Sequence, residues 1–423
     1  MHRRPLLTMV AIAATMAALA IIAAVSLGKG LLDPDGFLGP AWMRGPLLVG
    51  GAFLADLLPR TLWGSRFKPA LMPAIFKERI RTHWTRDRII LVVSGVVFFY
   101  ITYVAYRNLK SFLPAIRGPE TTYDRDLHLV DRTLMFGHEP SVLLHNILGT
   151  SFSAQILSSV YLWFLPLVPL ALTAWVVWSR KISYGYWFAV SQAIAWTLGT
   201  ASYYALPTLG PGFEYPWLYQ GLSTTASSRL MEALQYGRQD VNYNVIEGAV
   251  QSVAGFASLH CAITMLVALM IQATIKNRVL HWIGWVNFGI TVVATIYFGW
   301  HYIADDVAGV VIALVSYYLG GVASYQKFDR RHVVVDEATT STPAPDELQP
   351  CSLSSRHAVS SEQFCEKCFL CDSWALACRM CLGRRGSRPR RSQDFTKGTR
   401  RCERRGDARV WRPDDTASGE PRH

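Results

Sequence analysis

Residues 152–178 read FSAQILSSVYLWFLPLVPLALTAWVVW and contain no Asp, Glu, Lys or Arg. A helix of about 20 apolar residues is long enough to cross a bilayer, so this stretch predicts a membrane span. Six more stretches are similarly apolar, at residues 6–27, 89–106, 183–209, 255–275, 279–300 and 307–326. Residues 45–63 form a weaker candidate, because they contain Asp56 and are interrupted by Pro46 and Pro59. The fold class that this pattern predicts is all-α, a helix bundle that passes through a membrane several times.

The composition of the whole chain agrees with this class. Of the 423 residues, 51% are hydrophobic and only 17% are charged, whereas soluble domains contain about 25% charged residues. The formal net charge is +12. It divides into +7 over residues 1–326 and +5 over residues 327–423. Basic residues beside spans report orientation, so this charge does not indicate a nucleic-acid partner.

The basic residues between the spans predict sidedness. If the N-terminus is inside and residues 45–63 span, the inner segments carry 14 Lys and Arg in 41 residues, against 9 in 102 for the outer segments. Loops on the cytoplasmic side carry such an excess. We therefore expect a cell-membrane protein with eight spans and both termini cytoplasmic. The stretch at 6–27 is longer than the core of a secretory signal peptide, so we expect it to be retained.

Three regions follow from the distribution of the spans. Residues 1–88 hold two N-terminal spans and a basic cytoplasmic loop, residues 89–326 hold a core of six spans, and residues 327–423 form a polar tail. Seven of the eight cysteines lie in the tail, some with the Cys-x2-Cys spacing of zinc sites. The tail lacks a periodic apolar face, however, so we expect it to be disordered.

The outer loop between the first two core spans contains an amphipathic segment at residues 124–136. Leu127, Val130 and Leu134 recur at helical spacing among Asp and Arg residues. This pattern predicts a short helix. Such a helix lies either on the outer membrane surface or against the rim of the bundle, and the sequence favours neither.

Ionisable residues inside spans are costly to keep and are therefore functional candidates. His260 follows Ser258 at the start of one predicted span, and His301 and Asp305 stand where the last two spans meet. The predicted topology places all of them at the outer face. His301 and Asp305 are four residues apart and would share one face of a helix. A span start also favours an anion such as phosphate.

This set of side chains suits phosphoryl transfer through a phosphohistidine. A carboxylate beside an imidazole fixes its tautomer and stabilises positive charge on the ring, while a second histidine can protonate a leaving alkoxide. Other interpretations remain open. In the first, the histidines are packing residues. In the second, the Asp305–Asp306 pair is a polar helix start that faces water. In the third, two histidines and an aspartate bind a metal.

Three stretches resemble a known family. FASLHCA at residues 256–262 is similar to the second motif of the type 2 phosphatidic acid phosphatase superfamily, in the form found in inositol phosphorylceramide synthases. GWHYIADDVAG at residues 299–309 resembles the third motif, and YYALPTLGP at residues 203–211 resembles a stretch that these synthases carry at the end of the preceding span. The resemblance covers about residues 89–326 and implies a six-helix core.

The resemblance also implies roles. His301 would be the nucleophile, Asp305 its partner and His260 the acid for the leaving group, without a metal or an organic cofactor. The substrate would be a phospholipid or lipid phosphate at the outer face. The acceptor would be an alcohol such as inositol in a synthase-like phosphotransferase, or water in a lipid phosphate phosphatase. A non-catalytic transporter or scaffold with the same bundle is the third hypothesis.

The chain departs from the family where cations are expected. Ala294 and Thr295 stand in place of a Ser-Arg pair, Ala257 replaces a proline, and the Lys-x6-Arg-Pro first motif is missing. Lys110 and Arg117 have its spacing but follow the first core span, so we interpret them as coincidence. The candidate substrate-binding residues are Ser258, Tyr204 and two arginines of the outer loop, Arg229 and Arg238.

Overall fold

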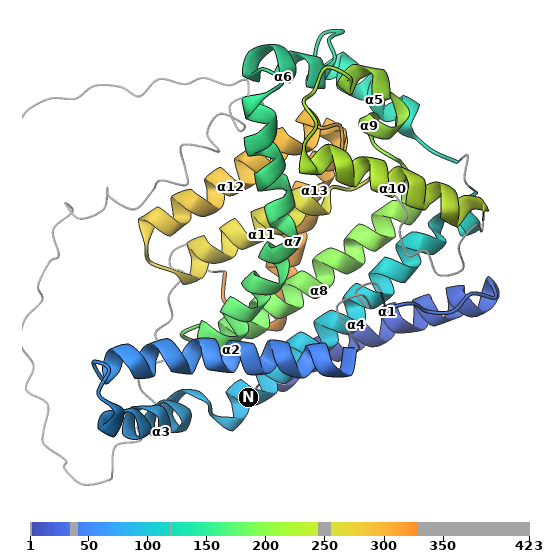
Figure 1. Cartoon of the computed structure of the whole chain (residues 1–423). Helices are drawn as coiled ribbons and strands as arrows, with labels where there is room; N and C mark the ends of the chain where they lie inside the picture. Colours follow the sequence, from blue (N-terminus) through green and yellow to red (C-terminus); the bar gives the residue numbers. More distant parts are fainter. Residues whose placement is uncertain (1, 34–40, 119–120, 244–254, 329–423) are drawn as a thin grey trace, which may run out of the picture. The chain divides into compact units, whose positions relative to one another are not determined.

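All eight apolar stretches form helices in the computed structural model, which describes residues 2–33, 41–118, 121–243 and 255–328 (Figure 1). These helices are α1 (Arg3–Ser26), α2 (Ala41–Gly64), α4 (Arg86–Arg117), α7 (Phe152–Trp178), α8 (Ile182–Ala205), α11 (Leu259–Thr274), α12 (Arg278–Tyr297) and α13 (Ile303–Ala323). The described residues contain no β-strand, so the all-α class is confirmed. The zinc and disorder predictions for the tail fall on residues outside this described part.

Five helices of the described residues are long and apolar enough to cross a membrane: α1, α4, α7, α12 and α13. The protein is thus a multi-pass membrane protein, although three of the eight predicted spans do not meet both conditions. Helix α11 has only 16 residues, or about 24 Å at 1.5 Å per residue. It begins at Leu259, four residues later than the predicted span, and this places its first turn inside the bundle.

Helix α8 is less apolar because other helices surround it. It packs against α1, α4, α7, α11 and α13, and its middle turns bury the polar residues Ser191, Gln192 and Thr200. Gln192 accepts a hydrogen bond from the indole N–H of Trp196 at 3.2 Å. A membrane helix that faces protein on most sides can carry such residues, because they are not exposed to the lipid.

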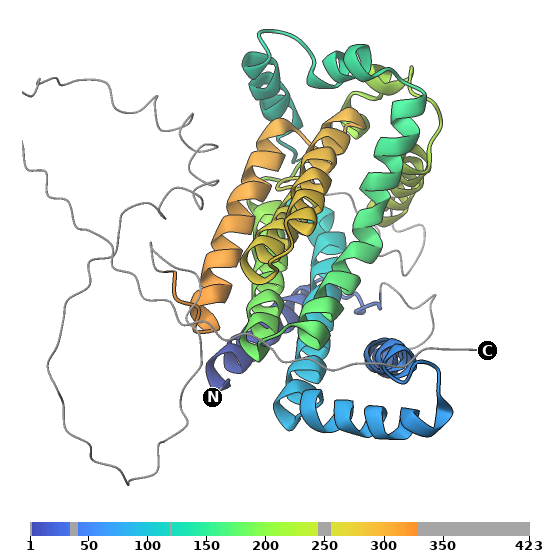
Figure 2. The same ribbon diagram turned by 90° about the vertical axis from the view of Figure 1, so that its left-hand side faces the viewer.

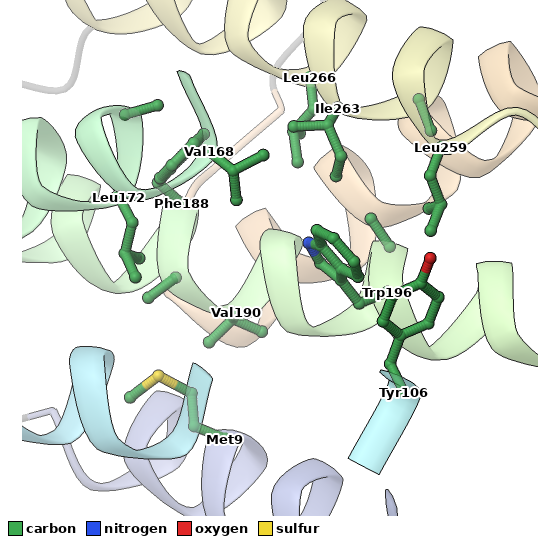
Figure 3. Packing of buried hydrophobic residues seen from close by; sticks show 14 of the residues in the cluster. Met9, Tyr106, Val168, Leu172, Phe188, Val190, Trp196, Leu259, Ile263 and Leu266 are labelled. Atoms are coloured by element: carbon green, nitrogen blue, oxygen red, sulfur yellow. The ribbon is translucent and has the colours of Figure 1, made fainter. Parts of the chain in front are cut away.

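Close helix contacts and large side chains both build the core (Figure 3). In one contact, a Cβ on Gly320 of α13 would lie 2.9 Å from the backbone nitrogen of Ser191 in α8. Small residues at such crossings let membrane helices pack tightly. Around Trp196, the rings of Tyr103 and Tyr106 from α4 pack edge-on with centroids 5.7 and 4.6 Å away. Figure 3 shows Trp196 between Tyr106 and the α11 side chains Leu259 and Ile263.

Helix α2 differs in direction from the span predicted at residues 45–63. In Figure 1 it runs across the lower end of α7, and in Figure 2 it is seen end-on beside α3 (Met72–His83). Its buried Asp56 accepts hydrogen bonds from Arg79 of α3 at 2.8 and 3.0 Å and from the indole of Trp84 at 3.0 Å. The carboxylate that interrupts this stretch thus joins α2 to α3. The sidedness that requires this span stays a prediction.

Four shorter helices lie at the opposite end of the bundle (Figure 1). They are α5 (Asp124–Leu134), α6 (Pro140–Leu148), α9 (Pro211–Glu214) and α10 (Ala226–Tyr243). Helix α5 contacts α13, α6 contacts α12, and α10 crosses from α7 to α4. The amphipathic segment at residues 124–136 is therefore a helix that packs on the rim of the bundle, next to the first turn of α13.

Candidate active site

His301 stands just before α13, not inside it. The helix begins at Ile303, so the expectation that His301 and Asp305 share a helical face is wrong in its local geometry. The pair still forms, because Nδ1 of His301 lies 3.4 Å from Oδ2 of Asp305. That oxygen also accepts the backbone N–H of Tyr302 at 2.9 Å, which ties the carboxylate to the helix start.

A glycine turn brings the chain from α12 to His301. Gly299 has a φ of +72°, and a Cβ there would lie 2.4 Å from the ring of Tyr219 and 2.7 Å from the backbone nitrogen of Gly212. Glycine reaches this conformation without steric cost. The backbone N–H of Gly212 donates to the Gly299 carbonyl at 2.7 Å, so the loop after α8 fixes the turn that precedes His301.

His260 comes from the first turn of α11 and meets His301 across the site. The two ring centroids are 5.9 Å apart, although 41 positions separate the residues in sequence. Tyr161 of α7 stacks on His260 with centroids 4.3 Å apart, and Phe164 lies on it at 4.1 Å. Side chains of α7 thus hold one ring while α13 holds the other. The structure brings together all three residues of the predicted catalytic set.

Ser258 joins the two motifs through the backbone. Its N–H donates to the carbonyl oxygen of Asp305 at 3.0 Å. A Cβ on Gly309 would lie 2.4 Å from the carbonyl oxygen of Ser258, which explains why a glycine follows one turn after Asp305. The Ser258 hydroxyl is fully buried and accepts the N–H of Cys261 at 3.3 Å. Ser258 therefore caps α11, and its hydroxyl is engaged within the protein.

Asp306 does not face water. It is 4% exposed and Asp305 is 0% exposed, so the interpretation of this pair as a solvated helix start is wrong. The carboxylate of Asp306 accepts hydrogen bonds from the thiol of Cys261 at 2.8 Å and the hydroxyl of Thr295 at 2.9 Å. Thr295 stands where the resemblance predicted an arginine. In this chain that position binds a neighbouring carboxylate and supplies no cation.

Two aspartates of α5 complete the support of the site, and the sequence analysis missed their role. Asp124 accepts the N–H groups of Leu209 and Gly210 at 3.0 and 2.9 Å and the hydroxyl of Tyr302 at 3.0 Å. Asp131 accepts the N–H of Ile303, the first residue of α13, at 3.0 Å. Both carboxylates are buried. They fix the segment that carries His301 from the side opposite to α11.

The seven-residue spacing of these aspartates was the available signal, because residues seven apart share a helical face. The apolar residues of α5 had suggested the opposite face for packing. Burial raises the pKa of Asp131 to about 7, and the negative charges of Asp305 and Asp306 add to this rise. Asp131 therefore takes up a proton near neutral pH.

A pocket opens beside His301. Asp131 and Glu139 line it together with His128, Tyr219 and Tyr302. Among the described residues around this pocket, none is Lys or Arg. Nε2 of His128 lies 3.4 Å from a carboxylate oxygen of Glu139, and its ring stacks on that of Tyr215. Nε of Arg132 lies 3.5 Å from the same oxygen of Glu139, so this carboxylate is already paired. The described lining of the pocket offers a phosphate no Lys or Arg of its own.

The remaining predicted substrate-binding residues are Tyr204, Arg229 and Arg238. The Tyr204 hydroxyl donates to the backbone carbonyl of Leu109 at 2.7 Å and so joins α8 to α4. Arg229 is exposed on α10. Arg238 belongs to the same helix, but its side chain lies outside the described residues. The described parts of the chain contain no group of three or more His, Cys, Asp or Glu side chains arranged to hold a metal ion.

Comparison with known proteins gives one finding. No curated protein and no solved structure was found to match. Members of the PAP2 superfamily are generally phosphatases or phosphotransferases, with a helical membrane fold. Residues 125–319, which include His260, His301 and Asp305 but not α4, match the family model of this PAP2 superfamily.

Proposed function

We propose that the protein transfers a phosphoryl or phospho-headgroup from a lipid to an acceptor alcohol through a phosphohistidine on His301. The observation that carries this proposal is the arrangement of the three side chains. Nδ1 of His301 faces Asp305 at 3.4 Å, and this leaves Nε2 free as the nucleophile. The ring of His260 lies 5.9 Å away, centroid to centroid, so a phosphorus atom between the rings can be reached by both.

In the first step, Nε2 of His301 attacks the phosphorus and the bond to the leaving oxygen breaks. His260 gives its proton to that oxygen, as a general acid does for a poor leaving group. The imidazole that carries the phosphoryl group gains positive charge, and Asp305 stabilises this charge. Burial strengthens the interaction, since Asp305 is fully enclosed.

In the second step, an acceptor hydroxyl takes the place of the departed alcohol. His260, now neutral, removes the hydroxyl proton while the oxygen attacks phosphorus and the N–P bond to His301 breaks. Both histidines return to their initial states. The same steps with water as acceptor describe a lipid phosphate phosphatase. The sequence likeness to inositol phosphorylceramide synthases at residues 256–262 supports an alcohol acceptor such as inositol.

The excess of basic residues in the predicted inner loops supports a site at the extracytoplasmic face of the cell membrane. The substrate would therefore be a phospholipid or lipid phosphate of the outer leaflet. The helices that cover the site, α5, α6, α9 and α10, all belong to the predicted outer loops.

The test is incubation of the purified protein with labelled phospholipids, with and without inositol or other alcohols. A labelled phospho-alcohol or exchanged lipid that requires the added alcohol supports the proposal. Labelled inorganic phosphate as the product would identify a phosphatase instead. If neither the wild type nor His301→Gln forms a labelled product in any arm, the protein is a transporter or scaffold and the proposal fails.

A further inference from the structure

A lipid phosphate needs positive charge near the two histidines, and the expected cations are missing. Thr295 occupies the place of the expected arginine and binds Asp306. The described residues that line the pocket beside His301 include no Lys or Arg, and Arg229 is exposed on α10. A cation for the phosphate could instead come from the His260 side of the site.

Helix α4 supplies one candidate, Lys110, which is only partly exposed. Its ammonium group lies 5.4 Å from the centroid of the Tyr203 ring, a cation–π distance. Tyr203 is buried at 3% exposure, so the lysine side chain points into the bundle. The neighbouring hydrogen bond from Tyr204 to Leu109 fixes α8 against α4 at this level.

Tyr203 lies beside Ser202, whose hydroxyl accepts the backbone N–H of Ala257 at 2.9 Å, three residues before His260. Tyrosines connect these positions. Tyr161 of α7 stacks on His260, and Tyr106 of α4 lies 6.1 Å from Tyr203, centroid to centroid. His260 itself is partly exposed, although aromatic rings pack on it. The histidine and the lysine therefore lie where α4, α7, α8 and α11 pack together.

The ammonium group of Lys110 has no counter-charge among the described residues. Within the described part of the chain its partner is the ring of Tyr203, and no carboxylate forms an ion pair with it. Lys110 is only partly exposed, and an aromatic face attracts its charge without neutralising it. A bound anion would supply the missing counter-charge.

We propose that Lys110 is the residue that binds the phosphate of the substrate and holds it between His260 and His301. This inference rests on the proposed function and adds a residue from α4, which precedes the matched range 125–319. Arg117, seven residues later, is exposed. We therefore still interpret the Lys-x6-Arg spacing of these two residues as coincidence. Lys110 is proposed because of its position in the bundle.

The test measures binding of inorganic phosphate to the purified full chain, as a shift in thermal unfolding. Phosphate should stabilise the wild type in proportion to its occupancy. In Lys110→Met its apparent dissociation constant should rise roughly 10- to 100-fold, the value of one lost charge-assisted hydrogen bond. Lys110→Gln, which keeps a polar end without charge, should show the same loss, and Lys110→Arg should bind within a few-fold of the wild type.

Arg117→Met is the matched control, because it removes the same charge from an exposed position of the same helix. It should bind phosphate as the wild type does. Equal weakening in Arg117→Met and Lys110→Met, undiminished binding in Lys110→Gln, or no stabilisation of the wild type by phosphate would each overturn the inference. Binding requires no turnover, so these outcomes are independent of the labelled-lipid test of the proposed function.

Discussion

The backbone N–H of Ser258 donates to the backbone carbonyl oxygen of Asp305 at 3.0 Å. This bond joins the start of α11, which carries His260, to the first turn of α13, which holds the partner of His301. Backbone atoms move less than long side chains do, so the separation of the two histidines is set by the fold. A site that must hold reacting groups within fractions of an ångström gains from such support.

Gly309 allows α13 to approach Ser258 closely, because a glycine leaves room for the carbonyl of Ser258. We expect Gly309→Ala to force α13 away from Ser258, since its Cβ would lie 2.4 Å from that oxygen. Both the melting temperature and the transfer activity should fall.

Gly289→Ala in α12 is the control for this prediction, because a Cβ there meets nothing within 4 Å. Alanine in a helix interior is more favourable than glycine by roughly 0.5–1 kcal/mol, so this variant should be as stable as the wild type or more so. A Gly309→Ala protein with native melting temperature and full activity would mean that the contact between α13 and Ser258 is not tight.

The nucleophile prediction concerns His301 and Asp305. His301→Gln should abolish the acid-labile phosphoenzyme and reduce turnover by about 10⁴-fold or more, because the residues of such a unit act together. Asp305→Asn should be nearly as damaging, since it removes the charge that stabilises the imidazolium. Quenched-flow labelling with a radioactive lipid phosphate measures both effects. A phosphoenzyme that persists in His301→Gln would assign the nucleophile to another residue.

Asp131 predicts how stability depends on pH. Its folded-state pKa is about 7, above the value of about 3.9 in an unfolded chain. The folded protein therefore binds the proton more tightly, and the contribution of this group to stability is present below about pH 4 and lost as pH rises through about 7. Between pH 5 and pH 8 the wild type should lose stability relative to Asp131→Asn, whose amide oxygen can still accept the Ile303 N–H.

Asp126→Asn is the matched control for the pH experiment, because Asp126 is exposed on the same helix. Thermal unfolding in detergent at several pH values measures the three proteins. The difference between the wild type and Asp126→Asn should not change in this window. A wild type and Asp131→Asn that respond alike to pH would show that Asp131 is ionised throughout.

The sequence predicted the helices and the meeting of the two motifs well, because both depend on long apolar stretches and on where they end. It did not predict the local structure at His301. A four-residue spacing suggests a helix, but whether the helix has started is decided by the Gly299 turn and by carboxylates far away in the chain. Asp124 and Asp131 act on backbone groups of residues 209–210 and 303, and no local pattern reveals such partners.

Sidedness is a prediction that reporter fusions can test. The end of α3 and the start of α4 lie beside the loop after α7, because His83 bonds the Val177 carbonyl at 2.7 Å and Arg88 donates to the Ser179 carbonyl at 2.8 Å. Since these neighbouring segments share the excess of Lys and Arg that marks cytoplasmic loops, reporters fused after Arg180 or Arg278 should read cytoplasmic. One inserted near Gln220 should read external. An external signal at Arg180 would reverse the orientation and place the site inside the cell.

The role of His260 can be separated from that of His301 by the choice of leaving group. His260→Ala should slow the transfer from a lipid phosphate by roughly 10²–10⁴-fold, because an alkoxide leaves poorly without a proton. Nitrophenolate needs little protonation, so a nitrophenyl phosphate ester should restore much of the rate of His260→Ala and none of that of His301→Gln. Rates of nitrophenol release give the comparison directly. Because Tyr161 and Phe164 pack on the His260 ring, His260→Phe keeps this packing and is the control for a collapsed site. Equal rescue of the His260 and His301 variants would show that the two histidines do not divide the work of acid and nucleophile in this way.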